Sequence, residues 1–350
     1  MTSKPTILDI AKRAKVSAMT VSNVMNHPER VETFTREKVL RIIEETNYAP
    51  SREAQRMGRR RKSGAANPNL TRTIGMVLFG GFRIDFHPFY AHIIELLGEE
   101  LLDRGHQLGF FHKETLLRDR PVLFNRLFRA EEIDGLFLLG PVGAPMTERL
   151  LEKKLPTVWI DPRSKYPVDV IQFDLVDGTR RAVEYLYQKG HRRIGYLGWG
   201  RIEEGKWDPR YQGYTEALAS LGLKQEASRE CLVSSPDYAS AYRGIRELLE
   251  RAKDLTAVFV GTDTMAFAAL AGASALGWKI PADLSMISCN GGILGEYTEP
   301  PLTTLRLHAP SIVKIAVDRL LARTLDPSLP PVTQSLSADL LERKSVRLLG

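Results

Sequence analysis

Residues 6–26 read TILDIAKRAKVSAMTVSNVMN and predict two short helices joined by a tight turn. Thr6 can cap the first helix with Asp9 three residues later, which is a variant of the capping box. Ser17 is placed to cap the second helix. The spacing of apolar residues predicts buried faces made of Leu8, Ala11 and Ala14 on the first helix and of Val21, Val24 and Met25 on the second.

A third helix is predicted to begin near Thr33 or Thr35 and to end by Pro50. Its buried residues are expected to be Val39, Ile42 and Ile43. Three helices that share one apolar seam are enough for a minimal domain.

Positive charge is concentrated around these helices. Residues 1–72 contain 15 Lys and Arg against 7 Asp and Glu, a net charge of +8, whereas the whole chain of 350 residues carries +7. The remainder is therefore nearly neutral, and binding to a polyanion is expected only at the N-terminal part.

The composition is that of an ordinary globular protein, with 43% hydrophobic and 26% charged residues. Cys231 and Cys289 form neither a disulfide framework nor a CxxC site, and the start of the chain lacks the apolar stretch of a secretion signal, so a cytoplasmic location is expected. The apolar run 256–278 contains Asp263 and is better explained by a buried strand followed by a packed helix than by a membrane span.

From Thr73 onward, β-like runs alternate with amphipathic helical stretches such as 91–105 and 265–277. This alternation predicts parallel sheets with crossover helices, and the number of units predicts two doubly wound subdomains with a cleft between them. The runs are TIGMVLF, QLGFF, GLFLLG, TVWID, RIGYLG, TAVFVG and DLSMIS.

The first two helices fit a helix-turn-helix, in which the second helix enters the major groove of DNA. Its first turns need short or polar side chains, and this segment has Ser17, Ala18, Met19, Thr20, Ser22 and Asn23. A small three-helix bundle without DNA function also shows Ala, Ser and Thr at its helix starts, but the local positive charge favours DNA binding.

Two motifs at the N-terminus, IxDIAKxAxVSxxTVSxVxN and TREKVLxxIEExxYxP, resemble those of the lactose-repressor (LacI) family of bacterial transcription regulators. The resemblance continues through LxxxGHRRIGYLG, RYQGYTEAL, PADLSMIS, PPLTTLR and DLLERKSV, so it covers almost the whole chain. It implies an all-α helix-turn-helix head and an α/β periplasmic-binding-protein-like body with two doubly wound parallel-sheet subdomains.

The resemblance implies three parts: a DNA-binding domain at 1–58 with a hinge helix at about 51–57, a basic linker at 59–72, and an effector-binding and dimerisation domain at 73–350. It also implies a homodimer that reads a pseudo-palindromic operator in double-stranded DNA. The implied DNA-binding residues are Thr6, Ser17, Ala18, Met19, Thr20, Ser22, Asn23, Asn26 and Met57.

Asn23 stands where the family usually has Arg, which predicts a preference for adenine in place of guanine at that half-site position. Ala18 and Met19 are expected to contact thymine methyl groups. The alternative is that Asn23 faces solvent or a phosphate.

In the hinge, Met57 takes the position of the family's Leu and is apolar enough to wedge into the minor groove, although it can equally be a linker residue without a role. Glu53 replaces a small apolar residue, which predicts weaker pairing of the two hinges. Arg59, Arg60, Arg61 and Lys62 can compensate through phosphate contacts or can be a solvated charge run.

By resemblance, the body binds a small effector between its subdomains. Arg210 matches the family's effector-binding Arg, Thr262 and Asp263 stand for its Asn-Asp pair, and Asn290 replaces the acid expected there. Loss of that acid makes an acidic or phosphorylated sugar more plausible than an unmodified monosaccharide. The implied effector-binding residues are Phe89, Tyr90, Phe173, Arg210, Thr262, Asp263 and Asn290; the aromatic residues among them can also be simple core residues.

No catalytic or metal site is predicted, and no cofactor. Gly200–Lys206, GRIEEGK, satisfies GxxxxGK, but Trp207 follows where a phosphate loop needs Ser or Thr. The chain contains no HExxH and no GxSxG. The expected function is therefore a repressor that is released by a sugar or sugar derivative, with a corepressor-dependent repressor or an activator as the alternative. A nucleotide- or sugar-processing enzyme with a basic head is a remote alternative, and so is a transport receptor. The chain ends without a heptad tail, so a dimer is expected rather than a tetramer.

Overall fold

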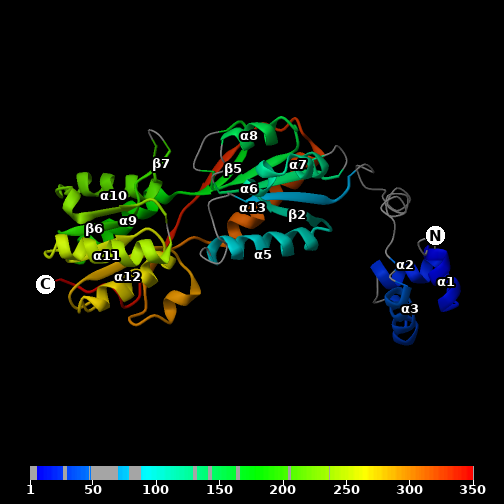
Figure 1. Cartoon of the computed structure of the whole chain (residues 1–350), viewed down its shortest axis with the longest axis horizontal. Coiled ribbons are helices and arrows are strands. Elements are labelled where there is room, and N and C mark those ends of the chain that lie inside the picture. Colours follow the sequence, from blue (N-terminus) through cyan, green and yellow to red (C-terminus); the bar gives the residue numbers. More distant parts are fainter. Residues whose placement is uncertain are drawn as a thin grey trace. The chain divides into compact units, whose positions relative to one another are not determined.

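The computed structural model describes residues 6–26, 30–46, 48, 70–78, 88–128, 132–140, 144–162, 166–203, 206–235 and 237–349. The chain divides into two compact units, Met1–Leu70 and Thr71–Gly350, each with a core of its own. The first unit is helical and the second is a two-lobed α/β body (Figure 1).

The helical unit contains the expected helix-turn-helix. The Thr6 backbone N–H donates to Oδ2 of Asp9 over 2.8 Å and the Asp9 N–H donates to Oγ1 of Thr6 over 3.4 Å, so the capping box is confirmed. Ser17 Oγ accepts from the Thr20 N–H at 3.0 Å, which confirms the second cap. Lys15 adopts a left-handed conformation with φ of 53° and turns the chain between the helices. The helices are α1 (Ile7–Ala14), α2 (Ala18–Asn26) and α3 (Thr33–Thr46).

The core of this unit corrects one predicted helix face. Leu8 is 68% exposed, whereas Ile10 is fully buried. Because α1 begins at Ile7, positions i, i+3, i+4 and i+7 place Ile7, Ile10, Ala11 and Ala14 on the inner face, and Leu8 lies about 100° away from that stripe. The other core residues include those expected on the second and third helices: Val21, Val24 and Val39, with Met25, Ile42 and Ile43 partly buried against them.

The N-terminal lobe of the body is a parallel six-stranded sheet in the order β13-β5-β4-β3-β1-β2. Its strands are β1 (Thr73–Leu78), β2 (Gln107–Lys113), β3 (Gly135–Leu139), β4 (Thr157–Ile160), β5 (Asp169–Phe173) and β13 (Thr333–Leu336). One face packs on α5 (Pro88–Asp103) and α13 (Ala309–Leu325), and the other packs on α6 (Glu114–Asp119), α7 (Pro121–Leu127) and α8 (Ala144–Leu151).

The C-terminal lobe repeats this arrangement in the order β14-β12-β11-β10-β6-β9, with only β14 antiparallel. Its strands are β6 (Ile194–Trp199), β9 (Glu230–Val233), β10 (Ala257–Val260), β11 (Ser285–Asn290), β12 (Thr303–Arg306) and β14 (Asp339–Leu341). The covering helices are α9 (Leu175–Gln188) and α10 (Pro209–Ser220) on one face and α11 (Tyr238–Arg251) and α12 (Asp263–Ala275) on the other. Two short 3-10 helices, Ala227–Arg229 and Ile293–Glu296, and a hairpin of β7 (Arg201–Glu203) and β8 (Lys206–Trp207) complete the lobe.

The chain passes between the lobes three times: from β5 to α9, from β12 to α13, and from β13 to β14 (Figure 1). One apolar cluster consequently continues through both lobes, from Ile74 and Phe137 in the first sheet to Phe259 and Ile287 in the second. The two doubly wound subdomains predicted from the sequence are therefore confirmed.

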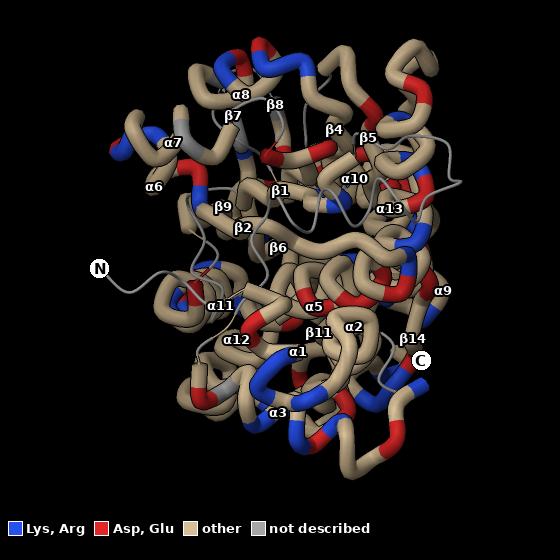
Figure 2. The backbone as a smooth tube through the Cα atoms, turned by 90° about the vertical axis from the view of Figure 1, so that its right-hand side faces the viewer, with Lys and Arg blue, Asp and Glu red and all other residues tan. Residues whose placement is uncertain are grey.

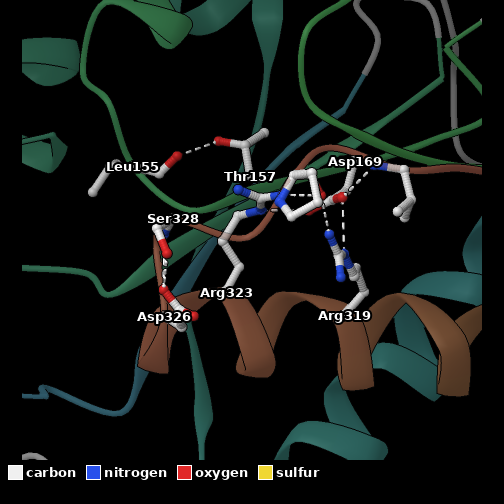
Figure 3. A network of polar contacts seen from close by, with 9 residues as sticks. Leu155, Thr157, Asp169, Arg319, Arg323, Asp326 and Ser328 are labelled. Atoms are coloured by element: carbon white, nitrogen blue, oxygen red, sulfur yellow. Dashed lines mark hydrogen bonds and ion pairs between the residues drawn. The ribbon is translucent and has the colours of Figure 1, made fainter.

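Helix α13 is fastened to the N-terminal sheet by a buried ion cluster (Figure 3). Asp169, at the start of β5, is fully buried and accepts from Arg319 and Arg323 of α13. The Val332 N–H also donates to Asp169 over 2.9 Å, and both Arg side chains reach the Pro330 carbonyl. A helix encoded after β12 of the second lobe thus becomes part of the first lobe.

Candidate functional sites

The helix-turn-helix presents a mixed surface at the start of α2. Met19 is 63% exposed and Ser17 is exposed, whereas Thr20, Ser22 and Asn23 are half-buried. Ala18 is half-buried against the core of the head, so little of it remains for a base contact. Thr6 is exposed beside Asp9 at the start of α1.

Basic side chains flank this surface. Lys12, Arg13 and Lys15 are all exposed at the end of α1, and Figure 2 shows basic residues on both α1 and α3. In the body, acidic and basic residues are both spread over many elements (Figure 2). The helical unit therefore has the charges that phosphate contacts require.

Part of the predicted DNA-binding set lies outside the described residues. These are Met57, the hinge segment 51–57 with Glu53, the cluster Arg59, Arg60, Arg61 and Lys62, and the side chain of Asn26.

In the body, the first five strands of each lobe's sheet, counted along the chain, lie in the order 2-1-3-4-5, which places a ligand site at the carboxyl ends of the strands. A cavity of about 510 Å³ lies there, at the junction of the lobes. It is lined from the N-terminal lobe by the start of α5 and by the start of α13, and from the C-terminal lobe by the start of α12 and by the segments after β11 and β12. Of the predicted effector-binding residues, Phe89, Asp263 and Asn290 line it directly.

Arg210 lies near the start of α10 and is only 4% exposed. Its Nη1 is 3.5 Å from Oδ1 of Asp208, and its Nε has no hydrogen-bond partner among the described residues. Burial alone would lower the pKa of Arg210, but the charges of Asp208 and, across the lobes, Asp161, together with the Cys289 thiol, raise it. Arg210 is therefore a permanent cation with an uncommitted donor beside the lobe junction.

Tyr90, Phe89 and Phe173 form an aromatic wall in the N-terminal lobe. The ring of Phe89 lies 5.9 Å from each of the other two rings. Tyr90 is 6% exposed, and its hydroxyl donates to Oδ2 of Asp161 over 2.8 Å. Phe89 lines the cavity, whereas Tyr90 and Phe173 support it from behind.

Asp263 has a structural task that its position in the sequence did not reveal. Its Oδ1 accepts from the hydroxyls of Ser288 and Thr304, and its Oδ2 accepts from the Gly292 N–H at 2.6 Å. Burial raises its pKa even against these bonds. Thr262 caps α12 by accepting from the Met265 N–H at 3.2 Å and does not line the cavity.

Asn290 ends β11 with a φ of 126°, and Gly291 follows with a φ of 74°. A Cβ on Gly291 would lie 2.5 Å from the Cα of Arg306, so only glycine permits this approach of β11 and β12. Oδ1 of Asn290 is buried without a hydrogen-bond partner among the described residues. A strained backbone and an unpaired buried acceptor at one position indicate a ligand contact.

Several residues at this site were not predicted from the sequence. Asp161 follows β4 directly, the same signal that pointed to Thr262 and Asp263 after β10. His92, Arg306 and His308 line the cavity. The Cys289 thiol is close to Arg210, and burial raises its pKa to about 11. Only the packing of the two lobes brings these residues together.

In the segment that satisfies GxxxxGK, Arg201–Glu203 and Lys206 belong to the antiparallel hairpin of β7 and β8. Asp208 then caps α10 by accepting from the Arg210 N–H at 2.9 Å. Among the described residues, no group of three or more His, Cys, Asp and Glu side chains is placed to hold a metal ion. No described helix combines the length and the apolar character needed to cross a membrane.

Two family models match the chain. The model for bacterial regulatory proteins of the lacI family matches residues 6–51, and the model for a periplasmic binding protein-like domain matches residues 183–346.

Characterised relatives match over nearly the full length. The HTH-type transcriptional regulator CelR of Thermobifida fusca is 31% identical in an alignment 335 residues long that covers 93% of this chain and 94% of CelR. The HTH-type transcriptional repressor PurR of Aliivibrio salmonicida (strain LFI1238) is 29% identical in an alignment 359 residues long that covers 98% of this chain and 99% of PurR.

Solved structures agree with the fold. A complex of the transcriptional regulator CelR with cellobiose superposes with a TM-score of 0.71 at 28% identity, covering 97% of this chain and 99% of that one. The lac repressor dimer bound to operator and the anti-inducer ONPF superposes with a TM-score of 0.72 at 24% identity, covering 99% and 100%, and shares the fold.

Proposed function

Because the chain belongs to the lacI family of bacterial regulatory proteins, which are DNA-binding transcriptional regulators, we propose that it represses genes under the control of a small-molecule effector. Its operator affinity depends on whether the cavity between the lobes is occupied. The observation that carries this proposal is the presence in one chain of a basic helix-turn-helix and of a cavity lined by Asn290, whose buried Oδ1 has no hydrogen-bond partner among the described residues.

On DNA, the chain acts as a homodimer that places two α2 helices in successive major grooves of a pseudo-palindromic operator, about one helical turn apart. Ser17, Met19, Thr20 and Asn23 face the bases, and Lys12, Arg13 and Lys15 hold the phosphates. The proposed parts are a DNA-binding domain at 1–58, a linker at 59–72 and an effector-binding and dimerisation domain at 73–350. As a regulator of bacterial genes, it works in the cytoplasm.

In the body, the effector is a sugar or sugar derivative that contacts Arg210 and Asn290 from one lobe and Phe89 from the other. The structure of CelR with cellobiose supports a carbohydrate ligand for this type of body. A ligand that touches both lobes stabilises one angle between them, and the altered angle changes the operator-competent population.

The experiment measures binding of the purified chain to palindromic and scrambled duplexes by fluorescence anisotropy at rising salt. Preference for a palindrome with a steep loss of affinity at high salt is expected, because phosphate contacts release counterions. Equal affinity for all duplexes contradicts the proposal. A thermal-shift screen of sugars then identifies ligands, since a ligand that binds only the folded state raises its stability.

The sign of regulation is the point on which the alternatives differ. An inducer weakens operator binding when it is added to the complex, whereas a corepressor strengthens it. Adding the screened ligand to the same anisotropy assay separates the two, and a reporter gene separates a repressor from an activator.

A further inference from the structure

We propose that the effector of this cavity is a hydroxylated organic anion, with its carboxylate or phosphate group near His92, Arg306 and His308 and its hydroxyl groups near Asn290. This inference rests on the proposed function, because it names the class of ligand that the same cavity binds.

The acidic side chain in the cavity is already occupied by hydrogen bonds within the protein. Asp263 is the only acid among the described residues that line the cavity. Its two oxygens already accept from Ser288, Thr304 and Gly292, and it is 4% exposed. A neutral sugar is typically held by carboxylates that accept from pairs of its hydroxyls, and this wall offers little free capacity for that purpose.

Basic side chains line the same cavity. His308 caps α13 through Nδ1, which accepts from the Ser311 N–H at 3.3 Å. The ring proton is therefore on Nε2, which is left as a donor. Arg306 lies on the wall with one Nη2 contact of 2.9 Å to Asp339, and its guanidinium has further N–H groups to donate. His92 lines the cavity from α5.

The backbone of three helices also favours an anionic ligand. The N-terminal ends of α5, α12 and α13 all line the cavity, and their partial positive charges favour an anion. Helix ends alone do not decide the ligand class, because this strand order points such ends at the cleft whatever the ligand is. Together with the Arg306 guanidinium, the Nε2 donor of His308 and one committed acid, they give the wall more donors than free acceptors.

The hydroxyl groups of the ligand are assigned to the Asn290 side of the cavity. Within the described part of the chain, Oδ1 of Asn290 is a buried acceptor without a partner, so a ligand donor such as a hydroxyl group would satisfy it. Arg210 interacts with the charges of two acids, Asp208 and Asp161, whereas Arg306 has one acidic partner, Asp339, so an anion gains less at Arg210 than at Arg306. Phe89, Phe267 and Leu294 cover the remaining wall and suit the C–H face of a polyol chain or ring.

The experiment uses the full chain and matched trios of ligands: glucose, gluconate and glucose 6-phosphate; galactose, galacturonate and galactose 6-phosphate; and ribose, ribonate and ribose 5-phosphate. Isothermal titration measures Kd for each. At least one anionic member is expected to bind about tenfold or more tightly than its neutral parent, because a hydrogen bond to a charged group contributes more than a neutral one. The carboxylate and phosphate arms distinguish the two kinds of anion. A neutral sugar that binds best, or a panel in which no anion binds, overturns the inference.

Three variants test where the anionic group of the ligand binds. Asn290→Asp adds a nearly isosteric negative charge and is expected to weaken the best anion about tenfold while the neutral parent changes little. Arg306→Gln is expected to weaken the same anion. Asp339→Asn breaks the same ion pair but keeps the cation, so it is the matched control and should leave anion binding unchanged or tighter. Loss of binding in Asp339→Asn equal to that in Arg306→Gln, or unchanged anion binding in Asn290→Asp, contradicts the proposal.

Failure here is distinguishable from failure of the proposed function. A neutral ligand that changes operator affinity keeps the regulator and overturns only the anionic class. Absence of any operator preference contradicts the regulator without touching the binding result.

Discussion

Nε of Arg319 donates to Oδ1 of Asp169 over 2.8 Å, and this bond joins α13, which follows β12 of the second lobe, to β5 of the first lobe (Figure 3). Burial alone would raise the pKa of Asp169, but the hydrogen bonds from Arg323, the Val332 N–H and Arg319 lower it. The carboxylate therefore stays charged inside the protein and holds α13, β5 and the segment before β13 together.

Replacing this carboxylate should strongly destabilise the body. Asp169→Asn leaves Arg319 and Arg323 without their shared partner, and removal of one member of a buried ion cluster costs about 3–5 kcal/mol. Urea unfolding followed by circular dichroism measures the change. Asp326→Asn is the matched control, because Asp326 is an exposed residue at the end of the same helix whose carboxylate bonds Ser328. Similar losses in both variants would contradict the role assigned to Asp169.

Stability should also depend on the protonation of His191. The side chain is fully buried, Nε2 lies 3.2 Å from the Arg347 carbonyl oxygen, and burial lowers the pKa of the imidazole from its ordinary value of 6.5 to about 4. The folded state then keeps the imidazole neutral while the unfolded state takes up a proton. The stability that the folded state gains from a neutral His191 is fully present above pH 6.5. It is lost as the pH falls from 6.5 to about 4, and the free energy of unfolding then changes by up to about 1.4 kcal/mol per pH unit.

The measurement compares unfolding free energies of the wild type and His191→Gln at pH values from 7 to 5. Gln keeps a donor for the Arg347 carbonyl but does not titrate, so its curve should be flatter over this range. Parallel curves would show that another group causes the pH dependence.

Base preference should follow the residue at position 23. Asn23→Arg is expected to move the preferred half-site base from adenine to guanine, since a bidentate contact discriminates by about 1–3 kcal/mol. Selection from a randomised half-site library measures the preference, and Asn23→Ala should lose it altogether. If the same base is selected by all three proteins, Asn23 does not read DNA.

Effector binding should require Arg210. Arg210→Met keeps much of the volume but removes the donors, and ligand affinity is expected to fall about 10- to 100-fold while operator binding without ligand persists. Titration of operator release measures this effect. Arg180→Met is a suitable control, because Arg180 bonds Asp177 and Glu184 on α9, away from the cavity. Equal responses in the two variants would remove Arg210 from the site.

Local chemistry made much of the fold predictable. The caps at Thr6 and Ser17 depend on side chains within three residues of each other, and the expected β-like runs correspond to β1, β2, β3, β4, β6, β10 and β11, which are largely apolar. The remaining strands were not predicted because they are short or carry polar residues, as in TQSL of β13 and ECLV of β9. Leu8 was assigned to the wrong face because the phase of a two-turn helix is poorly fixed by three apolar positions.

The site was predictable only in part. Arg210, Asn290 and Phe89 came from their resemblance to a family pattern, and the structure places them at the lobe junction. The bond between Tyr90 and Asp161 joins residues 71 positions apart, and His308 enters the cavity because the chain crosses between lobes at that point. Contacts of this kind depend on tertiary packing, which no local pattern records.

The final crossover has a consequence for the newly made chain. Because β13 and β14 supply an outer strand to each lobe, neither sheet is complete until its outer strand has left the ribosome. For the same reason, a single proteolytic cut between α13 and β13 would separate the outer strands of both sheets from the preceding chain.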